Sequence, residues 1–91
     1  MKIETISTGA YPMRQNVFKA MQDYDNLVVE FDYCDSKGDK SRRVVSPIRF
    51  LGGDRFLALC LSREEPRQFR MTRCQNLELK AAHNYLMPVA L

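Results

Sequence analysis

Short stretches in which apolar and polar residues alternate, each followed by a turn, make up most of this chain. The alternation is clearest in residues 27–34, where Val29, Phe31 and Tyr33 point to one side and two acids to the other. This pattern predicts a strand with one buried and one solvated face. Runs of a similar kind predict four further strands, at residues 42–50, 55–61, 67–71 and 76–79.

Turn residues and one proline set the limits of these strands. Turns are predicted at residues 35–40, 51–54 and 64–66, where Gly, Asp, Ser and Pro gather. Pro47 interrupts the second strand, and because proline cannot donate to a ladder, it predicts an edge or a bend there. The third strand is apolar on both faces from Phe56 onward, so it is expected to be the most buried element.

One helix is predicted before the first strand, over residues 13–24. Val17, Met21 and Tyr24 keep to one side, with Phe18 three residues before Met21, which is the spacing of a short amphipathic helix. A helix this short persists only against a partner surface, so it is expected to lean on the sheet. The fold class is therefore mainly β, a small closed or nearly closed antiparallel barrel with one N-terminal helix.

Length and composition place the chain among small globular domains. Its 91 residues suffice for one domain with a modest core, and 45% hydrophobic with 27% charged residues is ordinary globular composition. We expect a single domain over residues 1–91, with a core of about residues 14–79 and a tail of 80–91 that packs through Tyr85-Leu86-Met87. No apolar run could span a bilayer and the N-terminus lacks the apolar core of a signal peptide, so the cytosol is the expected location.

The nucleophilic and metal-ligating residues offer little for catalysis. Cys34, Cys60 and Cys74 are odd in number and show no CxxC pair, which argues against both a disulfide framework and a zinc site. Cys60 lies in an apolar run and is expected to be buried. His83 has no acid close in sequence and is expected to be a surface residue, and Gly52-Gly53 lacks the helix start of a phosphate loop. We therefore expect no enzymatic activity, no cofactor and no metal.

Positive charge is concentrated in the second half of the chain. The net charge is +3, but residues 1–36 carry a balance of −3 and residues 37–73 a balance of +6. A local excess of this kind attracts anions even where the global charge is small. Four arginines fall within eleven residues around one aromatic, at Arg63, Arg67, Arg70 and Arg73. Because the planar guanidinium suits phosphate and carboxylate groups, this block indicates an anion site, with a solvated hairpin face as the alternative.

Strand geometry divides the arginine block. Arg67, Phe69 and Met71 share one face of the predicted strand, whereas Arg70 lies on the other. Phe69 and Met71 are expected in the core, which places Arg67 at the rim and Arg70 on the outer face. Arg63 and Arg67 flank the turn, where like charges repel unless an anion or a neighbouring glutamate lies between them.

The order of four motifs along the chain is informative. They are Val29-Glu30-Phe31-Asp32-Tyr33, then Arg43-x-Val45-x-Pro47, then Gly53-Asp54-Arg55-Phe56-Leu57-Ala58-Leu59-Cys60, and last Arg63-x-x-x-Arg67-x-Phe69-Arg70-x-x-Arg73. In this order the chain resembles the WYL domain family over about residues 14–79. The Trp-Tyr-Leu triplet that names the family falls on Arg55-Phe56-Leu57, so the Trp is absent and another aromatic replaces the Tyr. The resemblance is therefore to a divergent member.

The resemblance implies a five-stranded SH3-like (Sm-like) barrel that serves as a regulatory, ligand-sensing module. Such domains typically follow a winged-helix DNA-binding domain in bacterial transcription regulators, and single-stranded nucleic acid is among their ligands. At this length a stand-alone member without a winged helix is expected, acting alone, as a homo-oligomer or with another protein chain. The basic groove of the family maps onto Arg63, Arg67, Arg70 and Arg73, with Arg43 as a weaker neighbour. Tyr33 or Phe56 is available to stack on a base where it is exposed.

Three functions remain open on the sequence. The leading hypothesis is a non-enzymatic module that binds an anionic ligand, with nucleic acid preferred. The second is a protein interaction or oligomerisation module, whose arginines form structural ion pairs with Glu30, Asp32 and Glu64. The third is a sensor of small molecules or nucleotides that uses the same groove. The sequence does not name the ligand, nor does it decide between activation and repression.

Overall fold

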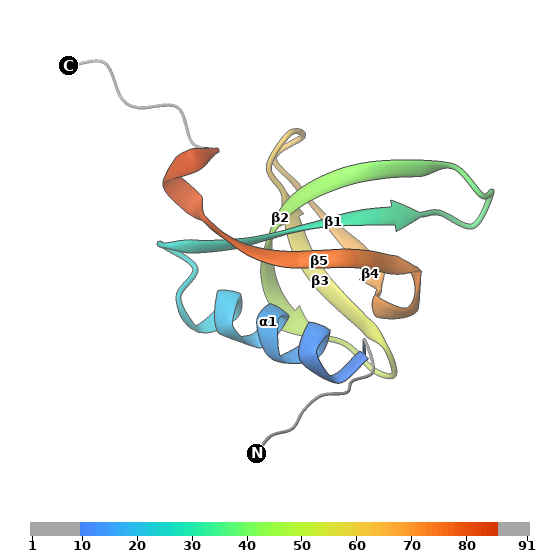
Figure 1. The fold of residues 1–91 in the computed structure, drawn as a ribbon, viewed down its shortest axis with the longest axis horizontal. Helices are drawn as coiled ribbons and strands as arrows, with labels where there is room; N and C mark the ends of the chain where they lie inside the picture. Colours follow the sequence, from blue (N-terminus) through green and yellow to red (C-terminus); the bar gives the residue numbers. More distant parts are fainter. Residues whose placement is uncertain (1–9, 86–91) are drawn as a thin grey trace.

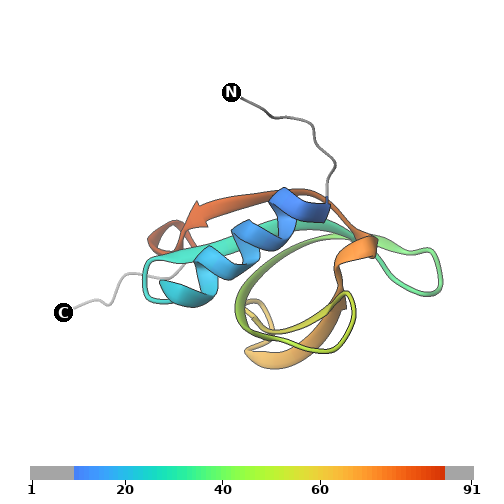
Figure 2. The ribbon, with the colours of Figure 1, turned by 90° about the horizontal axis from the view of Figure 1, so that it is seen from below.

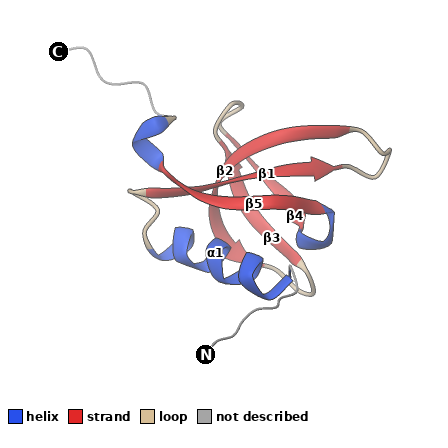
Figure 3. Cartoon of the chain, in the orientation of Figure 1, coloured by secondary structure: helices blue, strands red, loops and turns tan. Residues whose placement is uncertain are grey.

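Five antiparallel strands and one helix make up the protein in a computed structural model, which describes residues 10–85 (Figure 1). The principal elements are α1 (Ala10–Gln22), β1 (Leu27–Cys34), β2 (Lys40–Phe50), β3 (Arg55–Cys60), β4 (Glu65–Arg70) and β5 (Cys74–Ala81). Two short 3-10 turns, η1 (Met71–Arg73) and η2 (Ala82–Asn84), lie directly before and after β5 (Figure 3).

The strands form one coiled sheet. Their order is β4-β3-β2-β1-β5, and every neighbouring pair is antiparallel. The sheet curls so that β3 and β4 turn back under β1 and β5 (Figure 2). β4 and β5 are the edges of the sheet, and in the described part of the chain no ladder joins them. We call the open side between β4 on one hand and β1 and β5 on the other the seam. The predicted small antiparallel barrel with one N-terminal helix is confirmed, in an open form.

Two irregularities bend the sheet. In the β2–β3 ladder the register shifts between Pro47 and Arg49, which places an extra residue in β2. In the β1–β5 ladder it shifts between Glu30 and Asp32, opposite Asn76, whose φ is 55°. The bend predicted at Pro47 is confirmed, whereas the alternative of an edge strand is wrong, because β2 lies inside the sheet.

The core lies between the coiled sheet and α1. Phe31 lies 5.4 Å from Phe69 and 6.2 Å from Phe56, measured between ring centroids. Val17 and Ala20 of α1 are fully buried in the same cluster. The sheet thus supplies the partner surface that a 13-residue helix needs.

The face that α1 buries differs from the predicted one. The helix begins at Ala10 and ends at Gln22. Phe18 and Tyr24 were expected beside Val17, but Phe18 is 49% exposed and Tyr24, which follows the helix, is 65% exposed. Val17 and Ala20 are fully buried, and Met13 and Met21 pack against the core partly buried, so the predicted inward side of Val17 and Met21 holds. The ring of Phe18 instead stacks on Phe50 of β2.

The strands of the second half also differ in detail from the prediction. Burial along β3 alternates, with Phe56, Ala58 and Cys60 buried and Leu57 half-buried, because only the inner face of the sheet is covered. β4 already includes Pro66, which an edge strand tolerates. β5 is longer at both ends than residues 76–79, and Lys80 and Ala81 still pair with β1. The expected burial of Cys60 is confirmed.

The last described residues return to the start of β1. The backbone N–H of Ala82 donates to the carbonyl of Asn26 at 2.8 Å, and the hydroxyl of Tyr85 donates to Glu30 Oε1 at 2.8 Å. His83 lies exposed in η2, as expected. The predicted packing of Leu86 and Met87 lies outside the described residues.

Candidate functional site

Four arginines surround a hollow of about 330 Å³ at the seam. They come from β3, β4 and η1, and are Arg55, Arg67, Arg70 and Arg73. The end of β1 and the turn after it contribute Tyr33, Asp35 and Ser36. We call this site the arginine hollow. Its lining holds four guanidinium groups and one carboxylate, so its local charge is strongly positive.

Arg67 is the member of the arginine hollow whose side chain has no partner among residues 10–85. It lies half-buried on β4, opposite Ala58 in the ladder and two residues before the buried Phe69. Within the described chain its guanidinium forms neither an ion pair nor a side-chain hydrogen bond. Its five N–H donors are therefore available to an anion, and partial burial strengthens any bond that they form.

Arg70 is held from two sides. Its Nη1 lies 3.2 Å from Asp54 Oδ1, and its backbone N–H donates to the hydroxyl of Tyr33 at 3.2 Å. The second bond crosses the seam, because Tyr33 belongs to β1. In the β3–β4 ladder Arg70 lies directly opposite Arg55, so two like charges are neighbours on this hairpin.

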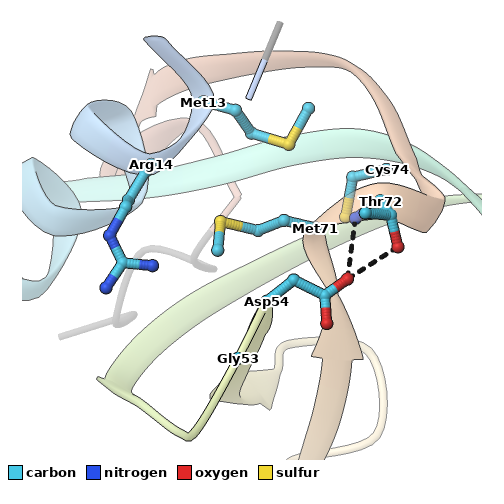
Figure 4. A pocket seen from close by; sticks show the side chains of 7 residues that line it. All are labelled: Met13, Arg14, Gly53, Asp54, Met71, Thr72 and Cys74. Carbon is cyan, nitrogen blue, oxygen red and sulfur yellow. Dashed lines mark hydrogen bonds between the residues drawn. The ribbon is translucent and has the colours of Figure 1, made fainter. Parts of the chain in front are cut away.

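Asp54 fixes both Arg70 and the turn that leads to β5. Its Oδ2 accepts hydrogen bonds from Thr72 Oγ1 at 2.6 Å and from the Thr72 backbone N–H at 3.4 Å (Figure 4). The bond from the Thr72 hydroxyl is the main reason that the pKa of Asp54 is lowered, and the charge of Arg70 lowers it further. This carboxylate is therefore ionised at neutral pH.

A second, mostly apolar cavity of about 410 Å³ lies beside Asp54 (Figure 4). Met13, Met71 and Cys74 line it, with Arg14 at one side. Burial raises the pKa of the Cys74 thiol to about 12, and its Sγ lies 3.4 Å from the carbonyl oxygen of Arg70. The thiol therefore stays protonated at neutral pH, which suits a structural role better than a nucleophilic one.

Neutral oxygens orient the other two arginines of the hollow. Arg55 donates from Nε to the carbonyl of Gly52 at 3.3 Å and from Nη1 to Gln68 Oε1 at 3.2 Å. Arg73 donates from Nη1 to the carbonyl of Asp35 at 3.1 Å. These bonds hold the guanidinium groups in place and leave their charge uncompensated.

The one carboxylate of the hollow is engaged in its own turn. Asp35 Oδ1 accepts the backbone N–H groups of Lys37 and Asp39, each at 2.9 Å. The bond from Asp39 is the main cause that lowers the pKa of Asp35, and the charge of Arg73 makes a smaller contribution. Asp35 therefore shapes the β1–β2 turn as well as facing the arginines.

The structure brings three of the four block arginines together and adds one that the sequence analysis missed. Arg63 lies exposed in the β3–β4 turn, outside the arginine hollow. Arg43 lies on β2, also outside it, and donates from Nε to Ser41 Oγ at 2.9 Å. Arg55, which stands where the family triplet has Trp, was missed. The signal that could have found it is its position opposite Arg70 once the β3–β4 hairpin is drawn in register.

Of the two aromatics proposed for base stacking, one is in the core. Phe56 has no exposed surface, because it points inward beside Phe69, so its assignment as a stacking residue is wrong. Tyr33 is half-buried and lines the arginine hollow, with its ring edge-on to Phe69 at 5.1 Å between centroids. Phe69 itself lies in the core, as expected.

Two of the three acids considered as ion-pair partners of the arginine block pair with a different arginine, Arg42. Arg42 Nε lies 3.0 Å from Glu30 Oε2, and its Nη1 lies 3.0 Å from Asp32 Oδ1. The bond from Arg42 is the main cause that lowers the pKa of Glu30, whereas for Asp32 the amide of Asn76 is the larger cause and Arg42 the next. Glu64 forms no ion pair in the described part of the chain. The ion pairs expected between the block and these acids are thus not present there.

Comparison with known proteins relates this chain to a family and its fold to a solved structure. The family model "WYL domain" matches residues 24–79. Among solved structures, Proteasome accessory factor B/C (PafBC) of Arthrobacter aurescens is similar, with a TM-score of 0.66 and 20% sequence identity over 97% of this chain. The chain spans 15% of the length of that PafBC chain, and a likeness at this identity shows the fold alone.

Two further observations complete the comparison. A search of curated proteins finds no match. Among the described residues, no helix has both the length and the apolar character needed to cross a membrane. Since the family model covers more than half of the sequence, from Tyr24 to Leu79, the chain belongs to the WYL domain family.

Proposed function

We propose that this WYL domain is a non-enzymatic regulatory module that binds an anionic ligand in the arginine hollow, and that the ligand is a single-stranded nucleic acid. WYL domains are associated with ligand sensing and regulation. The observation that carries the proposal is Arg67, a half-buried guanidinium without a partner in the described residues, among three other arginines. A phosphate group would satisfy Arg67 with two parallel hydrogen bonds.

The neighbouring residues support a polyanion. Arg55 and Arg70 face one another across the ladder, so an anion between them relieves the repulsion of two like charges. Tyr33 offers an aromatic surface in the same hollow, on which a base can stack. Arg63 lies exposed in the turn of the same hairpin, beside Glu64 and Glu65, and offers one further guanidinium outside the hollow, within reach of a chain of phosphates.

Oligonucleotide binding tests this proposal. Fluorescence anisotropy with labelled single-stranded DNA and RNA at several salt concentrations should show affinity that falls steeply with salt. Arg67→Ala should weaken binding and reduce the slope of log affinity against log salt by about 0.7 for each phosphate that it leaves without a positive partner. Arg49→Ala is the matched control, because Arg49 is exposed on β2 and has no side-chain partner in the described chain. Equal effects of the two substitutions, or binding without salt dependence, would contradict the proposal.

A protein interaction module is the second candidate. It is favoured by the bond between Arg70 and Asp54 and by the carbonyl contacts of Arg73, because these two arginines already have partners within the fold. On that reading, substitution of either arginine lowers stability and leaves oligonucleotide binding unchanged. A thermal-shift screen with mononucleotides and with oligonucleotides distinguishes a small-molecule sensor from a nucleic-acid-binding module and from a protein interaction module. Only a ligand that binds raises the unfolding temperature.

A further inference from the structure

Among residues 10–85, no segment covers a group of apolar side chains beside α1, away from the arginine hollow. These side chains line two hollows of about 410 and 460 Å³, each formed between α1 or its C-terminal end and β2. We define the α1 patch as Phe18, Met21, Tyr24, Ile48, Phe50 and Leu59. Three of the four large hydrophobic residues exposed in the described chain, Phe18, Tyr24 and Ile48, belong to it. Exposed apolar residues gathered along one helix and the neighbouring strand mark an interaction surface, whereas single exposed apolar residues are ordinary.

The centre of the α1 patch is held in place by stacking. The rings of Phe18 and Phe50 stack with centroids 6.4 Å apart and an interplanar angle of 23°. The guanidinium carbon of Arg14 lies 3.9 Å from the centroid of the Phe50 ring, on the helix turn before Phe18. These contacts fix the aromatic surface before any partner arrives, which reduces the entropy cost of association.

Charges of opposite sign flank the two ends of the patch. Arg14 lies before Phe18 on α1, and Asp23 and Asp25 lie on either side of Tyr24. Asp23 Oδ1 accepts the side-chain amide of Asn26, whereas the carboxylate of Asp25 has no partner in the described residues. A surface that is positive at one end, apolar in the middle and negative at the other is complementary to its own copy after a half turn.

We infer that the α1 patch is the interface of a two-fold symmetric dimer of this chain, in which Arg14 of each protomer pairs with Asp25 of the other. The two Phe18 rings then pack near the symmetry axis. A second copy of the chain fits this surface, because after a two-fold rotation its own α1 patch presents the opposite charge at each end and an apolar centre between them. None of the residues that line the arginine hollow takes part, so the inference is independent of the proposed ligand.

Sedimentation equilibrium on the full chain measures the dimer. The wild-type chain should dimerise reversibly with concentration, and Phe18→Glu should remain monomeric, since it places two like charges near the axis. A wild-type chain that is monomeric at every concentration, or a dimer that Phe18→Glu does not weaken, would overturn the inference. Circular dichroism checks that Phe18→Glu is folded.

Charge reversal gives a second test that leaves the apolar centre intact. Arg14→Asp alone and Asp25→Arg alone should each weaken the dimer about tenfold, because each replaces two attractive pairs by two repulsive ones. The double variant, or an equimolar mixture of the two single variants, should restore it. Lys37→Asp and Asp39→Arg in the β1–β2 turn are matched charge controls and should leave the dimer unchanged. Failure of the double variant to recover affinity, with both singles folded, would exclude this pairing and favour a different partner.

Discussion

The carboxylate of Asp54 lies 3.2 Å from the guanidinium of Arg70, and its other oxygen accepts two hydrogen bonds from Thr72. One acidic residue therefore orients an arginine of the hollow and also fixes the turn from β4 to β5. This turn is the chain connection between the two edges of the sheet.

Asp54→Ala should lower the free energy of unfolding, because the hydroxyl and the backbone N–H of Thr72 lose their acceptor. Urea denaturation followed by circular dichroism measures the loss. Asp39→Ala is the control, since that side chain has no hydrogen bond in the described residues. Equal stability of both variants would show that Asp54 does not fix the turn.

Acid should destabilise the fold. The pKa values of Glu30, Asp32, Asp35 and Asp54 are all lowered in the folded chain. A carboxyl group whose pKa is lower in the folded than in the unfolded chain stabilises the fold while it is ionised. This contribution is complete above the unfolded pKa of about 4 and is lost as the pH falls through the pKa of the folded chain. Urea midpoints should therefore be constant from about pH 7 to 5 and fall below about pH 4. Stability that rises on acidification would contradict the assignment.

Tyr33 should contribute to stability through its hydroxyl and to ligand binding through its ring. Tyr33→Phe loses the acceptor for the Arg70 N–H and should cost about 1 kcal/mol of stability, with little change in oligonucleotide affinity. Tyr33→Leu also loses the aromatic surface and should weaken binding about tenfold. Anisotropy and urea denaturation on the two variants separate these effects. Equal affinities of the two variants would exclude stacking.

Glu64→Gly should stabilise the chain. Glu64 has a φ of 56° in the β3–β4 turn, a left-handed conformation that glycine adopts without steric cost. The expected gain is about 0.5–1 kcal/mol in the free energy of unfolding. Glu65→Gly is the matched control, because Glu65 lies in β4, and it should destabilise by about 0.5–1 kcal/mol. A loss of stability in Glu64→Gly would mean that its side chain matters more than its backbone.

The local features of the fold were predictable from sequence. The period-2 alternation from Val29 to Tyr33 predicted β1, because successive side chains of a strand point to opposite faces. Turn residues placed the three hairpins β1–β2, β2–β3 and β3–β4 in the right order, and Pro47 predicted a bend. In each case the information lies within a few residues of the feature that it determines.

Features that depend on contacts between distant segments were harder to predict. The inward direction of Phe56 depends on the register of β3 between β2 and β4, which the local sequence does not show. Phe56 was therefore wrongly considered for stacking. Arg55 was missed for the same reason, since only the ladder places it opposite Arg70. Glu30 and Asp32 do not pair with the arginine block as considered, because Arg42 on the neighbouring β2 lies in register with Asp32 and forms ion pairs with both acids.

The seam has a mechanical consequence for this domain. No ladder sets its width in the described chain. Near the arginine hollow it is crossed by the hydrogen bond from Arg70 to the Tyr33 hydroxyl and by those from Arg73 to the carbonyls of Cys34 and Asp35. An anion held between β4 and the β1–β2 turn would add contacts across the seam, where no ladder joins the strands of the described chain. Ligand binding would then make local opening of β4 less frequent. Slower amide hydrogen exchange along β4 in the presence of the ligand would reveal this change.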